Sequence, residues 1–323
     1  MTNRKRKPPQ RRPAPSYRAP SRQAPEPRRG FLDRFAPRPP GTSPMPKLRT
    51  SIARGVTVVL ATPVLVASVP VVLLIEWIVL VGLGFQGPFA LLMSTFAVPP
   101  ISTWMDITLA FAVFSQAGRT GVGVALAPFA ATAAFILISA AFQAFVTTAA
   151  VERLRTGEVT SWTARRSVHV LPVTIAVGVA NLGVFIAAQF GQLLGAGIGL
   201  LVAVGVLMAG VYLLAFAPSI AADEDHRLAF TLSKSIRAAR MPGSNNLLLA
   251  ALYVVPSIAL FSATSLGSLP GSTIDVNPSI GAWVSVILIN LVQMAVVATF
   301  AFRYLSVAHE VPEPTPPPAR ARR

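Results

Sequence analysis

Six long apolar segments, separated by shorter polar or proline-broken stretches, occupy most of the sequence after residue 54. Each segment is long enough to cross roughly 30 Å of hydrocarbon as a helix that rises about 1.5 Å per residue. With 53% hydrophobic and only 12% charged residues, the chain carries more apolar surface than water could accommodate. We therefore predict an all-α fold, a polytopic transmembrane helical bundle of about six spans. The predicted spans are residues 55–82, 122–149, 168–190, 194–217, 247–267 and 281–302.

Both ends of the chain are rich in Arg and Pro and poor in apolar residues. Such a composition buries too little apolar surface to offset the entropy of ordering a chain. We therefore expect residues 1–54 and 307–323 to be disordered tails on either side of a six-span domain at 55–306. The first apolar segment is about 30 residues long, well above the hydrophobic part of a signal peptide, and we expect it to be retained as a helix.

The distribution of Lys and Arg predicts the orientation of the spans, because short cytoplasmic loops retain these cations. Fifteen of the 28 Lys and Arg residues lie in residues 1–54. With that tail in the cytoplasm, 26 of the 28 fall on the cytoplasmic side and Arg119 falls outside. Arg303 lies at the inner end of the last span, where its stem can snorkel to the headgroups. A five-span arrangement would place a basic loop or tail on the far side. The sequence thus predicts a multi-pass plasma-membrane protein with both termini cytoplasmic.

Residues 85–121 are apolar, but prolines and Asp106 interrupt them, so that no run is long enough to span. We expect this stretch on the outer face, with Trp104 at headgroup depth. It can form interfacial helices or a re-entrant hairpin, and the sequence leaves both open.

Two cytoplasmic loops share a plan in which a charged start is followed by a basic helix and then by a span, which indicates a distant internal repeat. The first loop, 152–167, contains Arg165 and Arg166. In the second, apolar side chains recur four, four and three residues apart on one helix face, at Leu228, Leu232, Ile236 and Ala239. Its cations, which we expect to point away from that face, are Lys234, Arg237 and Arg240. We predict an interfacial amphipathic helix on the inner leaflet, with the cations of both loops near anionic headgroups.

The stretch 213–255, LLAFAPSIAADEDHRLAFTLSKSIRAARMPGSNNLLLAALYVV, follows a pattern of multi-span bacterial membrane domains. A span ends at Pro, acidic residues follow, and a short helix with Ser and basic residues precedes the next span. With ERLRTGEVTSW in the earlier loop and the six-span layout of 55–306, it resembles the membrane domain that precedes some glycerophosphoryl diester phosphodiesterases, and relatives that consist of that domain alone. The phosphodiesterase barrel is missing from this sequence, so the resemblance implies a membrane fold and not that activity.

Four polar residues within the predicted spans are candidate functional residues: Glu76, Asn181, Asn290 and Gln293. A carboxylate in hydrocarbon is costly, which makes Glu76 a candidate for proton or ion coupling. Its distance of about 20 residues from the inner end of the span places it near the outer interface, where an interfacial or packing role suffices. The three amides can hydrogen-bond between helices or line a polar substrate path.

The chain offers few groups for catalysis, with 12 carboxylates, three His residues and no Cys. Motifs of phosphate-binding loops, zinc proteases and serine hydrolases do not occur in it. The cluster 223–226 fits helix capping better than a metal site, because consecutive helical residues point in different directions. We therefore expect no enzyme activity, no cofactor and no metal.

The leading functional hypothesis is a non-enzymatic scaffold, assembly or lipid-organising component. Its expected partners are membrane lipids, especially anionic lipids of the inner leaflet, and a protein that contacts the N-terminal tail. The alternative is a small-molecule or lipid transporter with a polar cavity lined by Asn181, Asn290 and Gln293. Nucleic acid is not expected, because no folded nucleic-acid module accompanies the basic tail.

Overall fold

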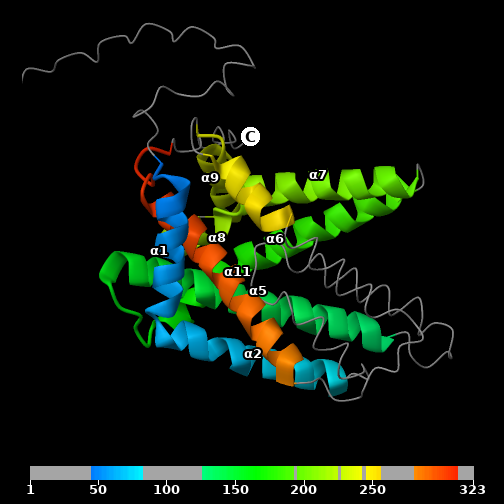
Figure 1. Cartoon of the computed structure of the whole chain (residues 1–323), viewed down its shortest axis with the longest axis horizontal. Helices are drawn as coiled ribbons and strands as arrows, with labels where there is room; N and C mark the ends of the chain where they lie inside the picture. The colour runs from blue at the N-terminus through cyan, green and yellow to red at the C-terminus, as the bar shows by residue number, and fades with distance from the viewer. Residues whose placement is uncertain are drawn as a thin grey trace, which may run out of the picture. The chain divides into compact units, whose positions relative to one another are not determined.

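Helices form all the regular secondary structure in the described part of the computed structural model, which confirms the all-α prediction for these residues. The structure describes residues 45–82, 126–192, 195–224, 227–241, 245–255 and 280–311. The helices (Figure 1) are α1 (Leu48–Leu60), α2 (Pro63–Gly82), α5 (Leu126–Thr156), α6 (Thr163–Gln192), α7 (Ala196–Leu214), α8 (Ala217–Asp223), α9 (Leu228–Ala239) and α11 (Ile280–Leu305), with a further helix over Asn246–Val255.

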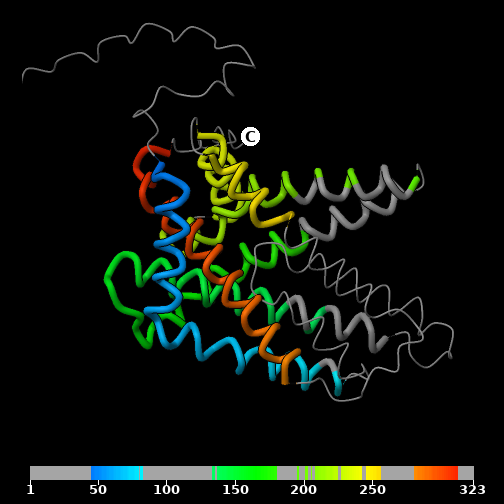
Figure 2. Tube along the Cα trace, viewed as in Figure 1, coloured from blue at the N-terminus to red at the C-terminus, as the bar shows by residue number. Residues whose placement is uncertain are grey.

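Pro63 divides the first predicted span into two helices. α1 ends at Leu60, and α2 begins at Pro63 with its axis turned by 74° (Figure 2). Proline has no N–H, and its ring clashes with the preceding helical turn, so the hydrogen-bond ladder of α1 stops there. The Thr62 hydroxyl donates to the Val58 carbonyl (2.7 Å) and helps to close the last turn of α1. The prediction of one continuous helix over 55–82 is therefore wrong.

The folded part reaches into both predicted tails. α1 begins at Leu48, and Met45 before it is buried in a hydrophobic cluster. At the other end, Val307 and Val311 belong to the same cluster, although α11 has already ended. The rest of both predicted tails, the predicted outer stretch 85–121 and the second half of the predicted span 247–267 lie outside the described residues.

α1 lies along the C-terminal half of α11 (Figure 1), and a glycine sets the distance between the two helices. A Cβ atom at Gly55 would lie 2.2 Å from Thr299 Oγ1 and 2.5 Å from the Ala295 carbonyl oxygen. Every residue larger than glycine would therefore force the helices apart. The residues of α1 that are buried by this packing are Ser51, Gly55, Val58 and Val59.

Hydrophobic clusters hold the helices of the described part together. α5, α6 and α7 pack successively on one another, α8 packs on α5 and α6, and α9 packs on α7 and α8. One cluster joins α1, α2, α5 and α11 and includes the fully buried residues Leu65, Val146 and Met294. The second joins α7, α8, the 246–255 helix and the end of α11, where the rings of Phe216 and Phe300 meet edge to face at 5.4 Å.

By length and composition, one helix of the described part, α11, can cross a membrane, and the bent pair α1 and α2 raises that number to two. The six-span arrangement stays a prediction. Both α2 and α11 also carry large apolar side chains on the face turned away from the protein. These exposed residues are Val64, Val71, Leu74, Ile75, Ile78 and Val81 on α2, and Ile280, Val284, Leu288 and Val292 on α11.

Candidate functional site

Glu152, near the end of α5, organises the connection to α6. Its side chain is buried, with 7% of the residue exposed. The carboxylate accepts hydrogen bonds from the hydroxyls of Thr160 (2.9 Å) and Thr163, and it forms an ion pair with Arg166 (3.5 Å). Because Thr163 is the first residue of α6, this negative charge lies at the N-terminal end of that helix, where the helix dipole favours it.

The electrostatic surroundings of Glu152 favour its ionised form. Burial acts to raise the pKa of Glu152, but hydrogen bonds from Thr163 and Thr160 and the positive charge of Arg166 outweigh it. The net result is a pKa below the ordinary value of 4.5. The carboxylate is therefore charged near neutral pH and pairs with the Arg166 guanidinium, whose side chain is 68% exposed.

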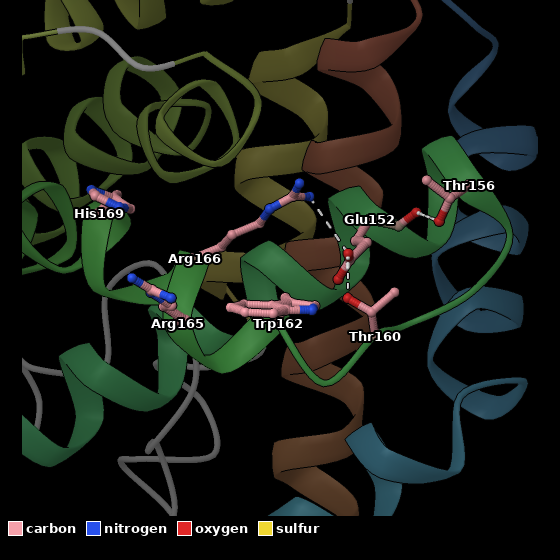
Figure 3. Close-up of a pocket in the computed structure, with 7 residues that line it drawn as sticks. All are labelled: Glu152, Thr156, Thr160, Trp162, Arg165, Arg166 and His169. Atoms are coloured by element: carbon pink, nitrogen blue, oxygen red, sulfur yellow. Dashed lines mark hydrogen bonds and ion pairs between the residues drawn. The ribbon is translucent and has the colours of Figure 1, made fainter.

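A pocket of about 590 Å³ opens beside this carboxylate. Figure 3 shows its lining, which consists of Glu152, Thr156, Thr160, Trp162, Arg165, Arg166 and His169. The Arg165 guanidinium lies 5.5 Å from the centre of the Trp162 ring, and Trp162 itself is 60% exposed. Two permanent positive charges and an imidazole thus line the pocket together with a single carboxylate. The pocket has an excess of hydrogen-bond donors and positive charge, which suits an anionic group with several acceptor oxygens.

The sequence singled out Arg165 and Arg166, and the structure brings both to this pocket. Sequence reasoning missed Glu152, Trp162 and His169 as members of the same site. Glu152 and Arg166 lie on different helices, and the turn between α5 and α6 brings them together. The available signal was an acid at the end of one predicted span followed by a basic run at the start of the next.

A second ionic cluster lies where α8, α9 and α11 meet. The Lys234 ammonium donates to both oxygens of the Glu224 carboxylate, each at 2.6 Å, and the Tyr304 hydroxyl donates to one of them at 2.6 Å. Asp223 forms an ion pair with Arg155 at the end of α5. Burial raises the pKa of Asp223 above its ordinary value, by more than the Arg155 charge lowers it.

The position of Lys234 corrects the prediction that it contacts headgroups. The residue is only 3% exposed, and its charge is compensated inside the protein by Glu224. α9 turns a small and polar face to the protein, where Ser235 donates to the Leu213 carbonyl (2.7 Å). Of the other predicted cations of this helix, Arg237 is half-buried and Arg240 is exposed.

The predicted apolar face of α9 is also only partly used for packing. Leu228 is exposed, Leu232 and Ile236 are half-buried, and Ala239 is buried. Leu232 packs against a small cluster formed by α6 and α8. The helix is thus docked on the protein by its polar side, because Glu224 and the end of α7 supply partners that its sequence alone does not show.

The sequence predicted that Arg303 snorkels from the end of the last span to the headgroups. The structure shows instead that Arg303 is buried inside the protein. It is 0% exposed. Its guanidinium donates to Asn246 Oδ1 (3.0 Å), the Pro46 carbonyl (3.0 Å) and Ser51 Oγ (3.2 Å). This fork of donors ties α11 to the segment that precedes α1 and to the start of the 246–255 helix, because a planar guanidinium can reach three acceptors at once.

The predicted intramembrane residues have different surroundings. Glu76 is 0% exposed, Asn290 is 0% and Gln293 is 3%, while the Asn181 side chain lies outside the described part. Since α2 starts at Pro63, Glu76 lies about 20 Å along it at about 1.5 Å per residue. It shares a buried helix face with the core residues of α2 and faces the protein, while its depth near the outer interface stays a prediction. The next residue, Trp77, meets Trp283 of α11 edge to face at 5.9 Å.

No family model, curated protein or solved structure matches this sequence, so the resemblance to a membrane domain of phosphodiesterases stays a prediction.

Proposed function

We propose that this chain is an integral membrane protein that binds anionic lipid headgroups at the inner leaflet and organises lipid there without catalysing a reaction. Insertion in lipid is supported by α2 and α11, which bear large aliphatic side chains on their outward faces as well as on their buried faces. A helix that is apolar all round is stable either inside a large protein core or in lipid. The outward faces of these two helices are not covered by the described residues.

The observation that carries the lipid-binding proposal is the pocket between α5 and α6. A phosphodiester headgroup offers several oxygens to the fork-shaped donors of Arg165 and Arg166. Trp162 beside them is a side chain typical of the interface between hydrocarbon and water. Positive charge at the ends of helices is also expected on the cytoplasmic side of a membrane.

Preorganisation distinguishes this pocket from a general basic surface. Arg166 pairs with Glu152, which in turn accepts hydrogen bonds from two threonine hydroxyls. Arg165 lies against the ring of Trp162. Side chains that already occupy their bound positions lose less conformational freedom when a ligand enters, and this favours a defined site over loose attraction to the leaflet.

The test is retention of lipid by the purified protein. The full chain is placed in phosphatidylcholine nanodiscs that contain a minor fraction of phosphatidylglycerol. The protein is then released from the nanodiscs, and the lipids that stay bound to it are counted by native mass spectrometry. Arg165→Gln should reduce bound phosphatidylglycerol about fivefold, the equivalent of about 1 kcal/mol per cation near a charged surface. Arg227→Gln removes an exposed cation outside the pocket and is the matched control. Equal losses in both variants, or no loss in either, would contradict the proposal.

Transport is a second candidate because α5 and α11 carry buried polar side chains. Gln143, Thr147, Asn290 and Gln293 are at most 6% exposed. In the described part, the Thr147 hydroxyl and the Gln293 side-chain oxygen have no hydrogen-bond partner. Such groups could line a path for a polar headgroup.

In proteoliposomes, the double substitution Asn290→Leu and Gln293→Leu should abolish transbilayer movement of a fluorescent phosphatidylglycerol while membrane insertion persists. Flux that survives it would remove this candidate.

A further inference from the structure

α1 presents three different faces around its axis. The face buried against α11 consists of Ser51, Gly55, Val58 and Val59. A second face is an exposed aliphatic stripe with residues four apart, Ile52 (38% exposed), Val56 (39%) and Leu60 (66%). The third face is exposed and polar and consists of Thr50, Arg54 and Thr57. At about 100° per residue, the three faces lie roughly a third of a turn apart.

The direction of α1 is fixed by the bend at Pro63. Its axis is turned by 74° from that of α2. If α2 runs along the bilayer normal, a helix at this angle lies close to the plane of the bilayer, and α11, beside which α1 packs, crosses the bilayer with a tilt. In that plane, the aliphatic stripe can face the hydrocarbon while the polar face is turned to water and the buried face stays on α11.

The charges around α1 indicate which surface it meets. Lys47, Arg49 and Arg54 are exposed at its start and along its length, and the helix contains no acidic residue. The sequence before residue 55 carries 15 of the 28 cations of the chain. Clusters of Lys and Arg next to an apolar helix face are attracted to anionic headgroups within a Debye length of the membrane.

We propose that α1 is an in-plane membrane helix, with Ile52, Val56 and Leu60 among the acyl chains and Arg49 and Arg54 at the phosphates of anionic lipids. This inference rests on the proposed insertion of α2, but not on the headgroup pocket. It assigns to α1 the interfacial position that the sequence predicted for α9. α1 differs from α9 in that its cations are all exposed, whereas Lys234 of α9 is buried.

The absence of Cys from the sequence allows a direct test with single spin labels on the full chain. Nitroxides are attached at Val56→Cys and Thr57→Cys, and the protein is reconstituted in vesicles of phosphatidylcholine with phosphatidylglycerol. Oxygen, which concentrates in hydrocarbon, should relax the label at position 56 several-fold more effectively than a water-soluble nickel chelate. The label at position 57 should show the opposite preference.

A label at Leu74→Cys, on the outward face of α2, separates the two proposals. If this label is reached by nickel and not by oxygen, the proposed membrane insertion itself fails. If it is reached by oxygen while position 56 is reached by nickel, only the in-plane helix is wrong. Protection of position 56 from both reagents, with spin–spin broadening, would show that a second copy of the chain covers the stripe and would also overturn the inference.

A separate experiment tests the role of the anionic lipids. Replacing both cations, Arg49→Gln with Arg54→Gln, should lower the oxygen-to-nickel ratio at position 56 in vesicles that contain phosphatidylglycerol, and should leave it unchanged in pure phosphatidylcholine. An equal ratio for both proteins in the anionic vesicles would contradict the role of the phosphates.

Discussion

Replacing Gly55 by Ala should loosen the contact between α1 and α11. The added methyl group would lie 2.2 Å from Thr299 Oγ1, 2.5 Å from the Ala295 carbonyl oxygen and 2.9 Å from the Thr299 nitrogen. Two of these three atoms belong to the backbone of α11, so a rotamer change cannot relieve the overlap. Overpacking of this kind costs about 1–3 kcal/mol. The higher helix propensity of Ala recovers only about 0.5–1 kcal/mol of that.

The chain offers a matched control for this substitution. Gly205 lies inside α7, and a Cβ there would meet nothing within 4 Å. Gly205→Ala should therefore leave stability unchanged or raise it slightly through helix propensity. A third variant, Gly55→Ala with Thr299→Ala, removes the hydroxyl but keeps the clash with the Ala295 carbonyl. It should restore only part of the lost stability.

The assay is thermal unfolding of the three variants in the same detergent or nanodisc. Gly55→Ala should lower the apparent midpoint by several degrees, at about 2–4 °C per kcal/mol for a domain of this size. If Gly55→Ala behaves like Gly205→Ala, the close approach of α1 and α11 is not a feature of the folded protein. Full recovery with Thr299→Ala would show that the side chain, and not the backbone, sets the distance.

Three further predictions concern the buried charges. Removing one partner of the Glu224–Lys234 pair should lower the free energy of unfolding by about 3 kcal/mol. Lys234→Met should lower it much less when Glu224 has already been replaced by Gln. If chemical unfolding shows that the two losses are additive, the two residues are not coupled. Since the folded pKa of Glu152 is lowered, its ionised form adds stability that is present above pH 4.5 and disappears as the pH falls through the folded value. Glu152→Gln should therefore flatten the acid side of the stability profile, and an unchanged profile would contradict this. Arg303→Lys should lose at least one charged hydrogen bond, worth about 1.5–3 kcal/mol, and expose residues 45–47 to limited proteolysis, whereas Arg240→Lys at an exposed position should do neither.

Long apolar runs were sufficient to predict helices, and the same information was insufficient to predict where one of them bends. Pro63 was visible in the sequence but lies within a run that is apolar on both sides of it. Proline is tolerated in membrane helices when neighbours satisfy the free backbone groups, so its presence alone does not decide between a kink and a break. Pro70 and Pro172 lie inside continuous helices of the same chain.

The surroundings of the charged residues were the least predictable part. The sequence predicts Arg303 at lipid headgroups because cations near span ends usually lie there, and Lys234 because it belongs to a basic amphipathic helix. Their actual partners, Glu224 for one and Asn246 with Ser51 for the other, come from different helices. Periodicity along one helix does not show which acceptor a second helix brings to it. The two arginines of the first loop, Arg165 and Arg166, were identified because no tertiary partner was needed to see a basic run.

The most direct test of the central claim is a cryo-EM structure of the full chain in nanodiscs that contain phosphatidylglycerol. The account predicts density for a headgroup phosphate in the pocket between α5 and α6, within hydrogen-bond distance of Arg165 or Arg166 and beside the ring of Trp162. It also predicts that this density disappears with Arg165→Gln and persists with Arg227→Gln. A pocket that lies away from the membrane surface, or that contains no headgroup in the anionic nanodiscs, would contradict it.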